Sequence, residues 1–241
     1  GIEIPLNFSR GIHNTYLSVG ATAGMISISD VDPPVFSVYS DLDRNGEMAY
    51  ASYYLTLQHT ITGALNSRIP RWGEVINLLY YHTPFESDYK GRMLSADLTL
   101  YLPSVFSTHG FRLCGGYVTN DISDYTFTQA LLFPRGYRAV IHEKFISGSA
   151  DYMFPIADFS LPVWKLIYFK RLNGSVFYDY GRGTTGDLTL DYSSAGFELT
   201  LVQNILSNPY LCFEAGLRYS YCFETGEWVP EFVLSIPLLE L

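Results

Sequence analysis

The sequence predicts an all-β protein: an antiparallel transmembrane β-barrel with about 11 or 12 strands in this chain, complete or as part of a barrel of about 16 strands. Apolar and polar residues alternate over most of the chain, which is the period of a strand with one buried face. Aromatic residues make up 16% of the chain and charged residues only 16%. No run of about 18 to 20 apolar residues is present, so no transmembrane helix is predicted. A membrane barrel reconciles these observations, because its lipid face is apolar only at every second residue.

Composition and charge exclude some classes of protein and leave others open. The 241 residues fit one large domain or part of a bigger protein. The formal net charge is −9, whereas a nucleic-acid surface needs clustered Lys and Arg, so we expect no nucleic-acid partner. On composition alone, a soluble β-sandwich or a lipocalin-like barrel is an alternative.

The cysteines and histidines show no pattern of metal ligands. Cys114, Cys212 and Cys222 have neither the even count of a disulfide framework nor the spacing of a zinc site. The five histidines are scattered along the chain: His13, His59, His82, His109 and His142. We therefore expect no bound metal and no cofactor.

The alternation predicts eleven strands. They lie near residues 2–9, 14–28, 48–64, 71–84, 91–103, 109–119, 144–156, 165–181, 192–205, 209–223 and 227–239. Several exceed the roughly 5 or 6 residues typical of soluble sheets and the roughly 9 to 11 that a tilted strand needs to cross hydrocarbon. From residue 109 onward, we expect six consecutive antiparallel strands interrupted only by one long loop.

Each strand's alternation also predicts which side chains face lipid. Between Pro209 and Phe223, apolar residues hold the odd positions, and mostly polar or small residues hold the even ones. Glu214 and Ser220 are therefore predicted to face the lumen. The residues predicted to face lipid include Leu98, Leu100, Leu211, Phe213, Leu217 and Phe232.

An odd strand number does not match bacterial single-chain barrels, which normally have an even count. Residues Val35 to Ser40 are the candidate for a twelfth strand. The chain starts at Gly1 without an initiator Met or the basic and apolar segments of a signal peptide. We expect the barrel domain, residues 1–241, to be the C-terminal part of a longer protein, with upstream strands or another chain closing it.

Residues 120–143 form the one long irregular region between predicted strands. A loop of this length inside a compact domain is usually functional or disordered. It contains Arg135, Gly136 and Tyr137. We expect the loop to fold into the barrel lumen, where Gly136 allows a close approach of the backbone to the wall and Tyr137 packs beside it.

Three carboxylates are predicted on the inner wall beneath this loop. Asp151, Asp179 and Glu198 each lie on the polar side of their strand, although Ile167 and Phe169 interrupt the polar side of the strand that carries Asp179. A guanidinium group binds a carboxylate through two parallel hydrogen bonds. We expect Arg135 to pair with Asp179, with Asp151 or Glu198 close by.

Four short motifs occur in a fixed order in the second half of the chain. They are Phe133-Pro134-Arg135-Gly136-Tyr137, the segment from Gly148 to Ile156 with Asp151 and Pro155, Phe177-Tyr178-Asp179-Tyr180-Gly181, and Ser194-Ala195-Gly196-Phe197-Glu198-Leu199. This set resembles the bacterial surface-antigen superfamily, which contains the outer-membrane protein assembly barrels and the two-partner secretion transporters. The family more often has Glu where this chain has Asp151, and the N-terminal half shares only the barrel pattern.

The resemblance implies a β-barrel in the bacterial outer membrane that takes part in outer-membrane protein assembly or translocation. It also implies that Phe177 and Gly181 belong, with Asp179, to the strand that receives the loop. The implied partners are outer-membrane lipid and periplasmic domains or other subunits of an assembly complex.

Other functions stay open at this point. The same type of barrel can anchor a fused periplasmic domain, such as a TolB-like propeller or a lipolytic domain, and a passive pore is less compatible with a loop that plugs the lumen. The segment from Asp41 to Gly46 resembles the start of a calcium loop, but Ser52 stands where an EF-hand needs Glu, so we expect a hairpin loop. No nucleophile elbow, phosphate loop or HExxH motif is present, and we expect no enzymatic activity.

Overall fold

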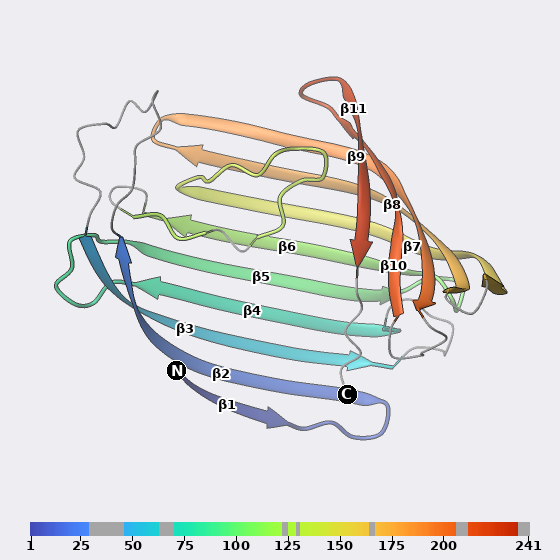
Figure 1. The fold of residues 1–241 in the computed structure, drawn as a ribbon, viewed down its shortest axis with the longest axis horizontal. Helices are drawn as coiled ribbons and strands as arrows, with labels where there is room; N and C mark the ends of the chain where they lie inside the picture. Colours follow the sequence, from blue (N-terminus) through green and yellow to red (C-terminus); the bar gives the residue numbers. More distant parts are fainter. Residues whose placement is uncertain are drawn as a thin grey trace.

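The structure is a computed structural model that describes residues 1–28, 46–62, 70–121, 125–128, 131–163, 167–205 and 212–235. These residues form eleven β-strands, each paired antiparallel with its chain neighbours in one sheet of order β1 to β11 (Figure 1). The predicted all-β antiparallel fold is thereby confirmed. Within the described ranges, no helix is long and apolar enough to cross a membrane.

The strand bounds are as follows. They are β1 (Ile2–Asn7), β2 (His13–Ile28), β3 (Gly46–Ile61), β4 (Trp72–His82), β5 (Arg92–Pro103), β6 (Gly110–Asn120), β7 (Lys144–Val163), β8 (Ile167–Thr185), β9 (Leu188–Ile205), β10 (Cys212–Cys222) and β11 (Glu227–Ser235).

Every predicted strand is present, and β6 to β11 form the expected run of six. The main difference is the length of β7 to β9. Strands β8 and β9 meet in a two-residue turn, where Gly186 has a φ of 57° that suits a tight hairpin. Three expectations lie outside the described residues: the strand at Val35 to Ser40, the facing of Leu211, and most of the loop from Asp41 to Gly46.

Bulges in β7 and β8 explain the interrupted polar face. Pro155 has no N–H for the ladder, and the register between β7 and β8 shifts directly after it. On β8, Phe169 lies opposite Gln203 and Arg171 lies opposite Val202, so Lys170 is an extra residue in the pairing with β9. One extra residue reverses the alternation of faces, which is why the apolar Phe169 precedes a polar face that begins at Arg171.

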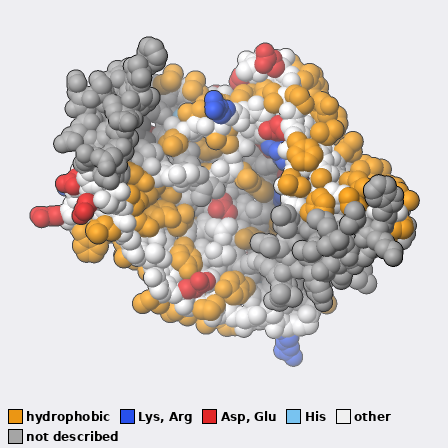
Figure 2. All heavy atoms as spheres, viewed as in Figure 1, with side chains coloured by type: hydrophobic (Ala, Val, Ile, Leu, Met, Phe, Trp, Pro, Cys, Tyr) orange, Lys and Arg blue, Asp and Glu red, His pale blue; other side chains and the backbone are white. Residues whose placement is uncertain are grey.

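The two faces of the sheet have opposite chemistry. The sheet curls, and the loop between β6 and β7 lies on its concave face (Figure 1). Polar side chains of this face are buried, and they include Ser18, Thr60, Ser95, Asn173, Asp179 and Thr200. The outer face exposes apolar side chains, including Val19, Leu78, Leu98, Ile146, Tyr178, Leu217 and Phe232. Acidic side chains are visible in the central hollow, and hydrophobic side chains gather around it (Figure 2). A water-soluble sheet has the reverse arrangement.

The buried apolar core lies between the loop and one end of the concave face. Met48, Met93 and Val118 contribute from β3, β5 and β6, and Phe127 of the loop packs against them. Phe145, at the start of β7, completes this cluster. The loop is therefore part of the packed core at this end of the sheet.

Phe145 provides a test of this packing. It is 1% exposed and stacks on Phe133 and His142, with ring centroids 4.9 and 5.7 Å away. Truncation leaves a cavity, so Phe145→Ala should lower the free energy of unfolding by about 3 to 5 kcal/mol in denaturant titrations. Ile146→Ala is the matched control, because that side chain faces outward and is 51% exposed. Equal losses for the two variants would contradict the assignment of Phe145 to the core.

Candidate functional site

The loop between β6 and β7 is fastened to the concave face along its described length. The backbone N–H of Asn120 donates to the Glu143 carbonyl at 2.6 Å, which joins the two ends of the loop. The Asn120 side chain donates to the Phe127 carbonyl at 3.0 Å, and the Tyr125 N–H donates to the Lys90 carbonyl at 3.1 Å. The described part of the loop thus follows the wall of the sheet (Figure 1).

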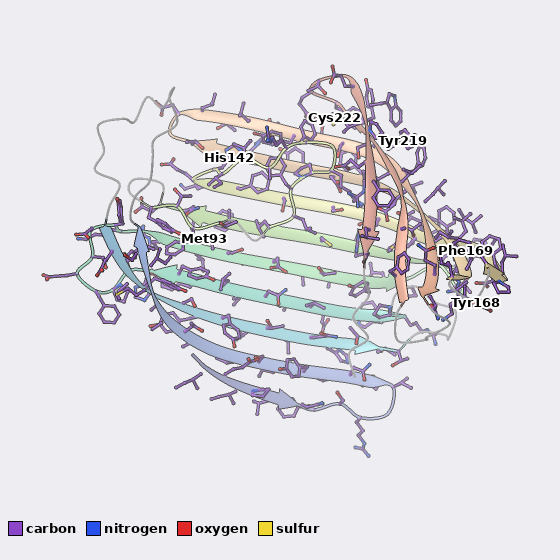
Figure 3. All side chains as sticks on the ribbon, in the orientation of Figure 1. Met93, His142, Tyr168, Phe169, Tyr219 and Cys222 are labelled. Atoms are coloured by element: carbon purple, nitrogen blue, oxygen red, sulfur yellow. The ribbon has the colours of Figure 1, made fainter. Side chains whose placement is uncertain are left out.

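Aromatic rings hold the second half of the loop. Phe133 stacks on Phe145 and meets Tyr192 of β9 edge-on, both with ring centroids 4.9 Å apart. His142, at the end of the loop, lies against Phe145 and has a ring nitrogen 3.1 Å from the Tyr192 hydroxyl. Figure 3 shows His142 at this end of the strands, with Tyr168 at the opposite end.

A tight turn between these anchors presents the arginine. The Tyr137 N–H donates to the Pro134 carbonyl at 3.3 Å, and Gly136 has a φ of 86°. A Cβ on Gly136 would lie 2.7 Å from Cys222 Sγ and 2.8 Å from Ser220 Cβ. Glycine is therefore favoured twice at this position, by the left-handed backbone and by the close approach to β10.

Arg135 binds Asp179 of β8 through both ends of the carboxylate. Its Nε donates to Oδ2 at 2.7 Å, its Nη2 donates to Oδ1 at 2.6 Å, and its backbone N–H donates to Oδ2 at 3.0 Å. The two side chains are only 14% and 4% exposed. The structure places in direct contact the two residues that the sequence analysis paired, in the charge-assisted bidentate geometry that arginine favours.

Three further residues complete this arrangement. Arg135 Nη1 donates to Asp151 Oδ1 at 2.7 Å, and Arg112 Nη2 lies 3.2 Å from Asp151 Oδ2. The Ser149 hydroxyl accepts from Arg135 Nη2 at 2.9 Å and donates to Asp179 Oδ1 at 2.7 Å. These five residues, on the loop, β6, β7 and β8, are called the Arg135 network. Its two guanidinium groups and two carboxylates sum to zero charge, which lowers the cost of burying them.

Phe177 and Gly181, the two other residues of the Asp179 motif that contact this region, determine how closely the loop packs against the wall. Arg135 Cζ lies 3.6 Å from the centroid of the Phe177 ring, in a cation–π arrangement. A Cβ on Gly181 would lie 2.9 Å from both the Phe145 ring and Pro134 Cγ. Gly181 therefore leaves the space into which the loop packs.

Tyr137 joins the loop to the turn between β10 and β11. Its hydroxyl contacts the Glu224 carboxylate and lies 2.9 Å from the Ser193 carbonyl oxygen. Ser193 donates to Glu224 through its backbone N–H at 2.9 Å and its hydroxyl at 2.8 Å. Burial raises the pKa of the Glu224 carboxyl, but the hydrogen bonds from Tyr137 and Ser193 lower that pKa by more, and the result lies below its usual value. The carboxylate is thus ionised at neutral pH and accepts these hydrogen bonds.

Glu198 lies on the same wall but outside the Arg135 network. Its Oε2 is 2.8 Å from Arg218 Nη2 of β10, and Arg218 Nη1 is 3.5 Å from Glu231 of β11. The structure therefore brings Asp151, and not Glu198, to Arg135. Glu198 instead helps to connect β9, β10 and β11.

The Arg135 network holds the loop against β7 and β8 through ion pairs. Both carboxylates already bind arginine, and the adjoining cavity of about 460 Å³ is lined by polar residues such as Asn77 and Asp97 and by apolar residues such as Leu131 and Phe133. Among the described residues, no three His, Cys, Asp or Glu side chains form a group that could hold a metal ion. The expectation that the chain has no enzymatic activity and no cofactor stays a prediction.

Sequence reasoning missed Arg112, Ser149 and Glu224. Arg112 lies on β6 between two apolar neighbours, and its strand register sets it directly opposite Asp151. Facing alone could therefore have suggested Arg112 as an inner-wall residue. Glu224 left no such signal, because its contact with Tyr137 depends on how far the loop reaches.

The Arg135–Asp179 pair gives a quantitative prediction. Arg135→Ala and Asp179→Ala should each lower the free energy of unfolding by roughly 2 to 4 kcal/mol, because each leaves a buried charge without its partner. The double variant should be little worse than either single one, since the two residues belong to one network. Arg135→Lys should restore only part of the loss, because lysine lacks the planar fork. A double-mutant cycle measured by denaturant unfolding checks these values.

Arg182 and Asp191 supply the matched control. Their Nε–Oδ1 distance is also short, 2.6 Å, but the side chains are 53% and 46% exposed. Water screens such a pair, so its coupling should be much smaller than that of the buried pair. Strictly additive losses at Arg135 and Asp179, no larger than those at the control pair, would contradict a buried clamp.

Comparison with known proteins adds no family to this description. Neither a protein-family model nor a curated protein matches the chain. The motif resemblance and the geometry of the Arg135 network are therefore the basis for the function that follows.

Proposed function

We propose that this chain is an outer-membrane β-barrel of the surface-antigen type that takes part in the assembly or translocation of outer-membrane proteins. The observation that carries the proposal is the Arg135 network, which fastens a long loop to the polar concave face of a sheet whose other face is apolar.

The outer face supports insertion into a membrane. Leu217, Phe232 and Leu234 are 52%, 71% and 61% exposed, and apolar neighbours continue across the sheet. Soluble monomers rarely expose apolar patches larger than a few hundred Å². Contact with hydrocarbon removes the free-energy cost of exposing these side chains to water. Strand pairing provides the backbone hydrogen bonds that lipid cannot supply. The proposal requires the edges at β1 and β11 to be paired as well, because an open edge cannot face lipid.

The loop supports a role beyond passive permeation. It is attached to β7 and β8 through Arg135, to β9 through the aromatic contacts of Phe133, and to the β10–β11 turn through Tyr137. A loop fastened at so many points across the concave face obstructs a wide passive pore. It also ties the conformation of the last strands to a single loop, which suits a barrel whose wall must respond to a client protein.

Membrane insertion is tested by spin labels in the reconstituted chain, with the native cysteines replaced by serine. Labels at Leu98 and Leu217 should report hydrocarbon through high oxygen accessibility, because both side chains face outward. Labels at Thr99 and Glu214, predicted on the opposite face, should report a polar environment. The reverse pattern would exclude a membrane barrel of this facing.

The assembly role is tested in a bacterium that carries the gene. Arg135→Ala should reduce the outer-membrane level of other β-barrel proteins several-fold, with Arg182→Ala as the control that keeps the Arg135 network intact. The level of the chain itself is measured in parallel, and Arg135→Lys provides a better-folded variant. Unchanged levels of other barrels on complete deletion would exclude the assembly role. If deletion instead removes only one attached periplasmic domain from the outer membrane, the chain is the membrane anchor of that domain.

A further inference from the structure

The outer face of the sheet is grooved across β1 to β5. The groove has a volume of about 580 Å³, and its lining is almost entirely apolar, with Ile4, Val19, Tyr53, Leu78 and Tyr80 among its residues. Strand register explains the hollow. Ala21 lies opposite both Ile2 and Tyr53, so a small side chain stands between two large ones.

A second hollow of about 550 Å³ continues from this groove toward the loop end of the strands. The two hollows share Tyr80 and Leu94. In the strand register, Leu94 lies opposite Thr119 of β6, and Thr119 lies opposite Lys144 of β7, so these three side chains form a row on the outer face. Arg92 lies two residues before Leu94, on the same face of β5. An apolar groove therefore ends at two cationic side chains.

Two cationic and two acidic side chains line the second hollow, so its formal charge sums to zero. Arg92 and Lys144 are both exposed, and neither has an ion-pair partner among the described residues. Two acidic residues also line the hollow. The Glu143 carboxylate accepts a hydrogen bond from the Gly186 N–H at 2.7 Å, and Asp121 takes part in an interaction of its own. What favours a negatively charged ligand is the position of the two cations, which are exposed and have no ion-pair partner among the described residues, together with the hydroxyls of Thr119 and Tyr80.

We propose that this surface binds a membrane lipid with an anionic, phosphorylated headgroup. The acyl chain lies along the groove between Ile4 and Tyr80, and the phosphate lies between Arg92 and Lys144. Guanidinium and ammonium groups form charge-assisted hydrogen bonds to phosphate, and apolar groove walls exclude water from the chain. The proposal rests on the proposed function, because an acyl chain reaches this face only if the face borders a bilayer.

The test measures lipid retention by native mass spectrometry of the purified chain in detergent. The probes are phosphatidylglycerol and phosphatidylcholine with identical acyl chains. The unaltered chain should retain the anionic lipid more strongly. Replacing both Arg92 and Lys144 with Ala should reduce that retention roughly tenfold, to the level of the zwitterionic lipid. Replacing Lys170 and Arg182 with Ala is the matched control, since it removes the same charge elsewhere and should change little.

A second variant tests the groove. Ala21→Phe fills the space between Ile2 and Tyr53, and it should weaken retention of both lipids while the cations are unchanged. Equal retention of the two lipids by the unaltered chain would overturn the proposal. So would tight binding of glycerol phosphate, which has the anion but no acyl chain. The spin labels at Leu98 and Leu217 distinguish failure of the lipid site from failure of the membrane barrel. If the labels report hydrocarbon but the chain shows no lipid preference, only the lipid site is refuted. If the labels report water, the membrane barrel is refuted as well.

Discussion

The guanidinium of Arg135 has to be neutralised where it lies, because water reaches only a small part of its surface. Asp179 and Asp151 supply that neutralisation, and both are themselves almost completely buried. A buried charge that loses its partner is costly, so the loop, β7 and β8 are held in one arrangement. Much else at this end of the molecule follows from that constraint. Gly136 must allow the turn, Gly181 must leave room for it, and Phe177 must lie flat beneath the arginine.

The same loop is also attached to the last hairpin of the sheet, β10 and β11. Two residues after Arg135, the Tyr137 hydroxyl contacts Glu224 in the turn between β10 and β11. Gly136, between them, lies so close to Ser220 and Cys222 of β10 that a Cβ at this position would clash with both. A short segment therefore bridges the Arg135 network and the last hairpin. Movement of that hairpin would disturb the buried ion pairs, and rearrangement of the ion pairs would release the hairpin. This reciprocal dependence is the physical basis of the proposed response of the last strands to a client protein.

The distribution of polarity constrains the rest of the molecule. Ion pairs, serines and asparagines occupy the concave face, and apolar side chains cover the outside. If the outer face borders lipid, as proposed, its apolar side chains have no hydrophobic drive to bind protein, and local differences in its shape and charge can favour particular lipids. The groove that ends at Arg92 and Lys144 is such a variation, and its apolar part lies on β1 to β5, which carry no residue of the Arg135 network. The proposed lipid contact and the Arg135 network therefore use opposite faces of the same sheet.

The sequence by itself determined the strands, their facing and the Arg135–Asp179 pair. Alternation has a period of two, and a residue's face follows from parity as long as no residue is inserted. Parity failed at Ile167 and Phe169 for that reason, since the bulge at Lys170 reverses it. Tertiary structure alone decided which carboxylate completes the network. Asp151 and Glu198 have the same type and facing, but strand order sets Glu198 beside Arg218 and Asp151 beside Arg112. The contact of Tyr137 with Glu224 and the continuity of the outer groove were likewise beyond the sequence, because loop reach and strand register bring together residues that no local pattern relates.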